Sequence, residues 1–125
     1  TAGAEVETMA VAHHDEILAA TSHLPHMLAF ALVDSLARLG DADEIFRYAA
    51  GGFRDFTRIA SSDPHMWRDI CIANREALGA MFEHFRNDML RLEEAVARAD
   101  GETLSEMFSR AKQARDRFYQ TDPSS

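Results

Sequence analysis

Cysteine, proline and glycine are all scarce in this 125-residue sequence. Cys71 is the single cysteine, and the chain holds only three prolines and six glycines. One cysteine excludes an internal disulfide, so the cytoplasm is the expected compartment. Because almost all prolines and glycines fall between segments with a 3.6-residue apolar rhythm, the sequence predicts an all-α fold.

Positive charge and long apolar runs are scarce as well. Thirteen Lys and Arg face 21 Asp and Glu, giving a formal net charge of −8. Without a Lys/Arg-rich stretch, neither nucleic acid nor an anionic membrane surface is an expected partner. No apolar run approaches the length of a membrane span, and residues 1–16 lack the pattern of a secretory signal. The sequence predicts one soluble domain over residues 1–125, and the missing initiating Met suggests that it was cut from a longer protein.

The apolar spacing predicts five to six helices, one of them long. Helices are expected over residues 4–21, 25–39 and 43–50, and one helical turn within 53–60. Ser62-Asp63-Pro64 is typical of a helix start, and the helix that follows is predicted to reach about Ala99, roughly 50 Å away. Part of so long a helix is expected to contact a second subunit. The spacing of Thr103 and Glu106 predicts a capping box for the last helix.

Six residues of ligand or acid/base type fall within fourteen positions: His13, His14, Asp15, Glu16, His23 and His26. A metal site is one hypothesis, but adjacent histidines point about 100° apart on a helix and cannot face one ion together. A solvated helix face or the edge of a core accounts for His13 and His14 better than a metal site does. His23 and His26 flank an expected helix N-terminus, where free N–H groups and the helix dipole favour an anion such as a carboxylate. Ordinary capping and packing is the alternative.

A second cluster runs from Gly51 to Arg58 and is followed by Ser61, Ser62 and Trp67. We expect this segment to be largely irregular, with Gly51-Gly52 allowing a sharp turn or a close approach to a ligand. An arginine can hold a carboxylate through two parallel hydrogen bonds, so the cluster suits a small anionic ring compound. The alternative is that Arg54 or Arg58 pairs with Asp55 and only stabilises the loop.

These motifs, in this order, resemble the C-terminal domain of bacterial prephenate or arogenate dehydrogenases. The resemblance covers about residues 13–118 and is carried by five blocks: His13 to Glu16, Ala20 to His26 with Ala29 to Leu32, Gly51 to Ala60, Ser62 to Pro64, and Met66 to Ile70. It implies an all-helical domain whose long helices interlock with a second copy. It also implies a cytoplasmic enzyme of tyrosine biosynthesis that oxidises prephenate to 4-hydroxyphenylpyruvate with loss of carbon dioxide, or arogenate to tyrosine, and passes a hydride to NAD or NADP.

The resemblance assigns substrate-binding roles to six residues. Arg58, the arginine of the Asp-Phe-Thr-Arg motif, is expected to bind a substrate carboxylate. His26, the second histidine of the His-Leu-Pro-His motif, is expected at the substrate pocket, and the first histidine, His23, is placed there less firmly.

The resemblance gives three further residues a role around the pocket. Trp67 helps to wall the site, and Asp55 and Gly51 shape the segment near the dimer partner.

Two departures from the family pattern have consequences. The sequence has no Gly-x-Gly-x-x-Gly motif after a strand, so the cofactor and the catalytic histidine are expected in a domain that this chain lacks. The chain alone is therefore expected to be inactive and to bind no cofactor or metal. Phe53 stands where some members carry a polar residue such as histidine, which leaves inhibition by tyrosine open.

Two other classes of function compete with the substrate wall. One is a helical dimerisation module without a ligand site, in which the arginines have structural roles only. The other is a standalone four-helix metal or phosphotransfer protein. The family's motifs account for the histidines better than this last hypothesis does. Substrate preference and the choice of NAD or NADP depend largely on the missing half.

Overall fold

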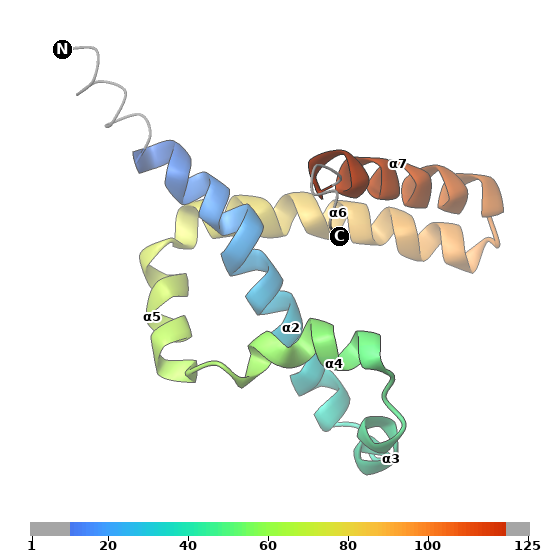
Figure 1. The fold of residues 1–125 in the computed structure, drawn as a ribbon, viewed down its shortest axis with the longest axis horizontal. Coiled ribbons are helices and arrows are strands. Elements are labelled where there is room, and N and C mark those ends of the chain that lie inside the picture. Colours follow the sequence, from blue (N-terminus) through green and yellow to red (C-terminus); the bar gives the residue numbers. More distant parts are fainter. Residues whose placement is uncertain (1–10, 120–125) are drawn as a thin grey trace. The chain divides into compact units, whose positions relative to one another are not determined.

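The computed structural model describes residues 11–119, which form helices joined by short turns and include no strand (Figure 1). The predicted all-α class is confirmed. The chain divides into two compact units, one ending at Glu83 and the other beginning at His84. A single domain over residues 1–125 stays a prediction.

The first helix runs without a break from Val11 to Ala37. It contains a π-helical turn, η1 (Ala19–His23), and continues as α2 (Leu24–Ala37). The predicted boundary between two helices near Pro25 is therefore wrong. Pro25 lacks the N–H of a regular turn, and the wider π turn accommodates it, since the Leu24 N–H bonds the Ala19 carbonyl five residues back.

The helix Val11–Ala37 is more apolar than was predicted from the sequence. An 18-residue window within Val11–Ala37 has a mean hydropathy of 1.3, so by length and composition it passes the test for a membrane span. The prediction that no such run exists is wrong. One such helix is weak evidence for a membrane, because core helices of soluble proteins pass the same test. Only 17% of the window is fully buried, and many of its other residues are half-buried in the single chain.

Two short helices and a 3₁₀ turn pack against α2: α3 (Ala42–Arg47), α4 (Gly51–Thr57) and η2 (Arg58–Ser61). The expectation of an irregular segment after Gly51 is wrong, because Gly51 and Gly52 form the first turn of α4. No described glycine has a positive φ, and a Cβ on either residue would meet nothing within 4 Å. Neither glycine is required by a sharp turn or a close contact in the single chain.

The predicted long helix is two helices, α5 (Pro64–Ala73) and α6 (Arg75–Ala97), which run in different directions (Figure 1). The predicted start is confirmed, since the Asp63 side chain accepts a hydrogen bond from the His65 N–H at 2.9 Å. The single helix is wrong because Asn74, with φ −113° and ψ 33°, leaves the helical conformation. Its side chain bonds to the first helix instead of to solvent.

A Schellman motif ends α6, and an aspartate begins α7 (Gly101–Tyr119). Asp100 N–H bonds the Ala95 carbonyl, and Ala99 between them has φ 54°. The predicted capping box at Thr103 is wrong, because Thr103 donates to Asp100 through its N–H at 3.1 Å and its hydroxyl at 2.7 Å. The Thr103 hydroxyl and N–H lower the pKa of the Asp100 carboxyl.

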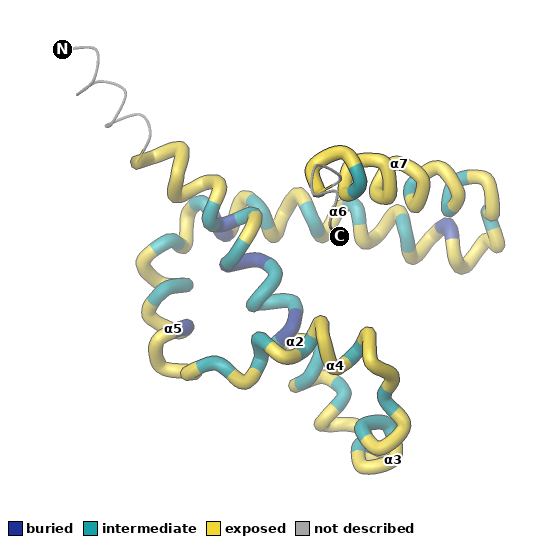
Figure 2. Tube along the Cα trace, viewed as in Figure 1, coloured by how far each residue is buried: buried dark blue, intermediate teal, exposed yellow. Residues whose placement is uncertain are grey.

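The core of the described residues is thin. Figure 2 shows the buried positions mostly along the first helix, with few elsewhere. His23 is the one buried polar residue of the described part, 9% exposed. Half of the six buried apolar residues are alanines: Ala19, Leu24, Ala29, Trp67, Leu78 and Ala95. Large apolar side chains remain in water, among them Phe108, which is 58% exposed, and Phe118, which is 71% exposed.

Replacing Ala99 with glycine should stabilise the chain. The left-handed conformation costs an L-residue about 1–2 kcal/mol, and glycine's greater freedom when unfolded offsets part of the gain, so we expect roughly 0.5–1 kcal/mol. Urea unfolding followed by circular dichroism measures the difference. Ala114→Gly, in the regular part of α7, is the matched control and should lower the free energy of unfolding by about 1 kcal/mol. Equal losses in the free energy of unfolding of Ala99→Gly and Ala114→Gly would contradict the left-handed conformation of Ala99.

Candidate functional site

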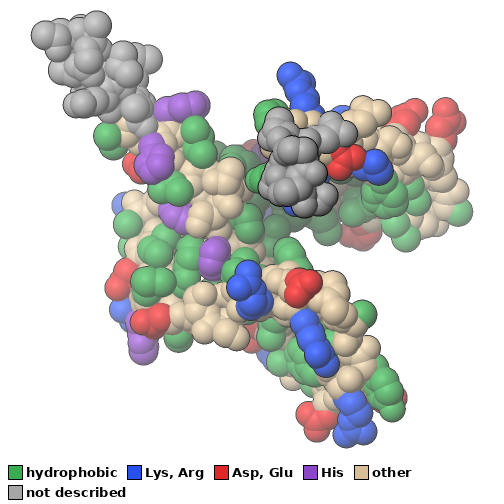
Figure 3. All heavy atoms as spheres, viewed as in Figure 1, with side chains coloured by type: hydrophobic (Ala, Val, Ile, Leu, Met, Phe, Trp, Pro, Cys, Tyr) green, Lys and Arg blue, Asp and Glu red, His purple; other side chains and the backbone are tan. Residues whose placement is uncertain are grey.

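Two histidines of the first helix meet the tryptophan of α5. The His26 ring stacks on the Trp67 indole, with centroids 3.8 Å apart and planes at 19°. His23 meets the same indole edge-on, at 5.8 Å and 80°. Figure 3 shows histidine side chains in purple along this helix. Three of the predicted site residues, His23, His26 and Trp67, are thus brought together, and we call them the His–Trp cluster.

The cluster does not surround a helix N-terminus. His23 and His26 lie within the continuous helix Val11–Ala37, where backbone N–H groups have partners along the helix. The expectation of an anion held by free N–H groups at this point is therefore wrong. Any anion near the cluster must be bound by side chains.

The hydrogen bond of His26 defines its tautomer. Its Nδ1 lies 2.8 Å from the Ser22 carbonyl oxygen. A carbonyl only accepts hydrogen bonds, so in the neutral ring Nδ1 carries the proton and Nε2 keeps a lone pair. The half-buried His26 therefore offers a hydrogen-bond acceptor beside its stacked indole.

His23 is held from the junction between α5 and α6. The Asn74 amide nitrogen lies 3.2 Å from His23 Nδ1 and donates to the Asp15 carbonyl at 3.0 Å. Burial lowers the pKa of His23, repulsion by His26 lowers it further, and Asp15 raises it in part. The ring is therefore kept neutral near pH 7.

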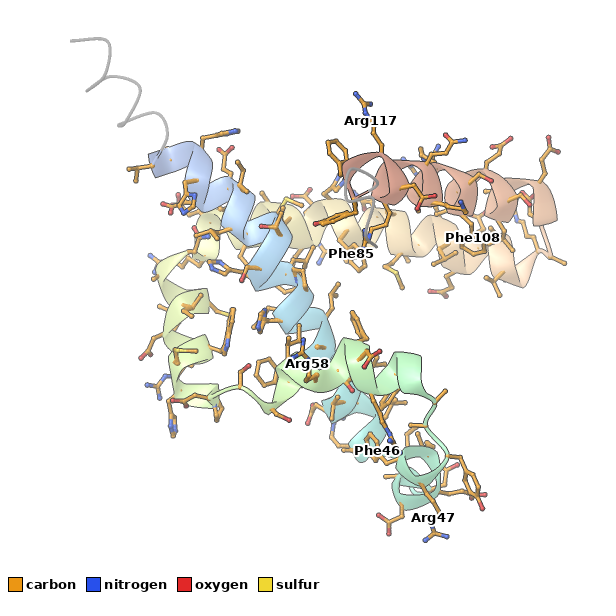
Figure 4. The ribbon with its side chains drawn as sticks, viewed as in Figure 1. Phe46, Arg47, Arg58, Phe85, Phe108 and Arg117 are labelled. Carbon is orange, nitrogen blue, oxygen red and sulfur yellow. The ribbon has the colours of Figure 1, made fainter. Side chains whose placement is uncertain are left out.

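Arg58 begins η2, which packs against α2, and its side chain is exposed (Figure 4). Among residues 11–119 no ion pair joins Arg54 or Arg58 to Asp55 or to any other carboxylate. The alternative in which Asp55 holds one of these arginines is thus not observed. The Arg58 guanidinium is available for a carboxylate ligand.

The remaining predicted residues lie apart from the His–Trp cluster in their contacts. Gly51 and Asp55 are exposed on α4, and no hydrogen bond of the described chain joins them, or Arg58, to the cluster. Asn74 is a functional residue that the sequence analysis missed, because it falls inside the single long helix predicted from Pro64 to about Ala99. A polar amide at an apolar position was the available signal.

A small cavity lies against Trp67. It has a volume of about 200 Å³ and is lined by Met27, Phe30, Pro64, Trp67, Arg68 and Cys71. The Cys71 thiol donates to the Met27 sulfur at 3.1 Å, and burial raises the pKa of Cys71. A protonated, sulfur-paired thiol is a poor nucleophile, so this side of the indole provides packing rather than covalent chemistry.

The described residues thus form an all-helical domain with a stacked His–Trp cluster and an arginine without an ion-pair partner. Residues 10–110 match the family described as prephenate dehydrogenase, dimerization domain. The chain belongs to this family. The family resemblance seen in the sequence is confirmed.

Individual relatives agree with this membership. A cyclohexadienyl dehydrogenase of Zymomonas mobilis is 41% identical over 115 residues, which cover 90% of this chain and 39% of that protein. A prephenate dehydrogenase of Bacillus subtilis is 38% identical over 86% of this chain and 29% of its own length. The chain therefore spans well under half of these relatives.

Solved structures show the same fold. Prephenate dehydrogenase from A. aeolicus, in complex with hydroxyphenyl propionate and NAD+, superposes with a TM-score of 0.76 at 42% identity, over 84% of this chain and 37% of that one. Synechocystis arogenate dehydrogenase gives a TM-score of 0.80 at 25% identity, over 86% of this chain and 40% of that one.

The buried neutral His23 should make stability depend on pH. Because its pKa is lower in the folded chain than the ordinary 6.5, the unfolded state binds the proton more readily, and stability is lost as pH falls below about 6.5 toward the lowered pKa. Urea unfolding at pH 7.5 and 5.5 should show a smaller loss in His23→Gln than in the unaltered chain. The control, His65→Gln at an exposed position of α5, should lose as much stability between the two pH values as the unaltered chain does. Identical losses in the unaltered chain and His23→Gln would contradict the assignment.

Proposed function

We propose that this chain is the dimerisation and substrate-binding part of an NAD- or NADP-dependent prephenate or arogenate dehydrogenase. The observation that supports it best is Arg58 without an ion-pair partner on η2, which packs against α2, whose His26 stacks on Trp67 of α5, in a chain of this family. The reaction is the oxidative decarboxylation of prephenate to 4-hydroxyphenylpyruvate, or the corresponding oxidation of arogenate to tyrosine. We propose a cytoplasmic location for it.

The cofactor would be bound mainly outside this chain. Residues 11–119 are helical and contain no strand–turn–helix of the kind that holds a dinucleotide pyrophosphate. When bound, NAD or NADP accepts the hydride, while this chain holds and orients the ring that loses it. The chain by itself would then be inactive.

Each predicted residue has a physical role in this proposal. The planar guanidinium of Arg58 would hold a substrate carboxylate by two parallel charge-assisted hydrogen bonds. Trp67 with His26 would wall the apolar ring, and the free Nε2 of His26 would accept a hydrogen bond from a hydroxyl group. His23 would hold the Trp67 ring in place through its edge-on contact. Asp55 and Gly51 would shape the exposed α4 segment next to a partner subunit.

The competing proposal is a dimerisation module without a ligand site. The exposed apolar surface favours dimerisation in both proposals, because single soluble domains seldom leave so many large side chains in water. The two differ in whether Arg58 and the His–Trp cluster contact a ligand. Tyrosine as an inhibitor belongs to the first proposal alone.

Removal of Arg58 should weaken substrate binding in an active enzyme. We would build a chimera in which this chain replaces the matching 39% of the Zymomonas mobilis protein and follow NAD+ reduction with prephenate. Arg58→Ala loses a charged hydrogen bond of about 1.5–3 kcal/mol, so KM should rise about ten- to a hundredfold.

Arg47 provides the matched control for this experiment. It lies exposed on α3, apart from Arg58 (Figure 4), and Arg47→Ala should leave KM within twofold. An Arg58→Ala chimera with unchanged KM but a lower melting temperature would support the module without a ligand site and overturn the substrate role.

The chain should form a homodimer through its exposed apolar side chains. Light scattering over a concentration series should give twice the mass of one chain. Phe108→Asp removes an apolar side chain whose burial is worth about 1.5–3 kcal/mol, so the dissociation constant should rise at least tenfold. Ser109→Asp adds the same charge at the next, exposed position and should have less effect. A single-chain mass at every concentration would refute dimerisation.

A further inference from the structure

We infer that Asn74 is a positioning residue that fixes the ring orientation and the tautomer of His23. Asn74 lies fifty-one residues from His23 in sequence and bridges the α5–α6 junction to the first helix. The inference rests on the proposed function only for its consequence in catalysis. The hydrogen-bond geometry carries the rest.

The Asp15 carbonyl determines which way the Asn74 amide faces. This carbonyl oxygen lies 3.0 Å from Nδ2 and can only accept, so the NH2 group and not the amide oxygen must face it. The amide nitrogen carries a second hydrogen and has no available lone pair. At 3.2 Å from His23 Nδ1, that second hydrogen makes Nδ1 the acceptor.

With Nδ1 as acceptor, the neutral His23 ring carries its proton on Nε2. His26 has the opposite tautomer, because its Nδ1 donates to the Ser22 carbonyl. The cluster therefore combines one ring whose Nε2 donates with one whose Nε2 accepts. An acceptor at His26 Nε2 can bind a hydroxyl group but not a carboxylate or carbonyl, which have no hydrogen to donate, whereas freely interconverting imidazoles make no such distinction.

The backbone at Asn74 supports a dedicated role. The helix breaks at this residue, with φ −113° and ψ 33°, although the residues on both sides are helical. The break places the short side chain against the first helix. Asn74 is thus positioned by the backbone, while His23, held against the Trp67 edge at 5.8 Å, receives its hydrogen bond.

Two titratable groups near His23 affect its pKa. Asp15 and His26 lie on its own helix and act on its pKa in opposite directions. From the α5–α6 side it meets the Trp67 ring and the Asn74 amide, neither of which titrates near neutral pH. A substitution of Asn74 should therefore change the tautomer or the pKa of His23 directly.

Nitrogen-15 NMR of the histidine rings in the 125-residue chain tests this inference without any variant. At pH 7.5, Nδ1 of His23 should resonate in the range of an unprotonated ring nitrogen and Nε2 in that of a protonated one. His26 should show the reverse pattern. A protonated Nδ1 on neutral His23 would overturn the inference.

Two substitutions sharpen the test. Asn74→Ala should replace the single His23 tautomer with a mixture. Asn74→Asp offers an acceptor of nearly the same shape, so the Nδ1–H tautomer should dominate and the pKa of His23 should rise by roughly one to three pH units. Asn87→Ala and Asn87→Asp, at an exposed position of α6, are the controls and should leave the His23 signals unchanged. Unaltered His23 signals in the Asn74 variants would also overturn the inference.

The consequence in catalysis is measured separately in the Zymomonas chimera. Asn74→Ala should lower kcat/KM roughly tenfold or more, because misplaced site groups are costly, and Asn74→Asp should shift the pH profile of kcat/KM upward. An active chimera that tolerates Asn74→Ala would overturn the positioning role. An unsubstituted chimera that folds but never reduces NAD+ would instead refute the proposed function, and the NMR result would still decide the tautomer.

Discussion

The Asn74 side chain makes the contact on which the rest of the candidate site depends. Its amide joins the α5–α6 junction to the Asp15 carbonyl and the His23 ring, which lie two turns apart on the first helix. The few other side-chain hydrogen bonds of the described chain are nearly all local. Helical propensity alone would continue α5 into α6. The hydrogen bonds from Asn74 to the first helix therefore form at the residue where the regular helix is interrupted. Without that break, the side chain could not reach the first helix.

The π turn has the complementary effect on the first helix. A regular helix through residues 19–25 would leave a carbonyl without its donor at Pro25, whereas the wider turn shifts the register by one residue and allows the helix to continue. His23 and His26 consequently meet one indole, edge-on and face-on. Irregular turns in both packed segments thus build the His–Trp cluster.

The sequence predicted the fold class and most of the site, but not its geometry. The 3.6-residue rhythm and the motif order were sufficient for an all-helical member of this family, because both are local properties of the chain. The predicted helix boundaries are wrong: a helix start was predicted at Pro25, and Asn74 falls inside the single long helix predicted from Pro64 to about Ala99. Both errors have one physical source, since a tertiary hydrogen bond or a π turn can override the local signals of Pro and Asn. Arg58 was found because guanidinium chemistry does not depend on whether its segment is a loop or a helix.

The position of Arg58 follows from these same contacts. It begins a single 3₁₀ turn after a seven-residue helix, and neither element is long enough to be stable in water alone. Both pack against α2, so α2 is the support for the guanidinium as well as for His26. The helix Val11–Ala37 therefore supports both Arg58 and His26, and only 17% of its apolar window is fully buried in the single chain. Covering the exposed part of that window with a partner subunit would stabilise the helix and, through it, the geometry of the proposed site, and would thereby couple dimerisation to the proposed substrate binding.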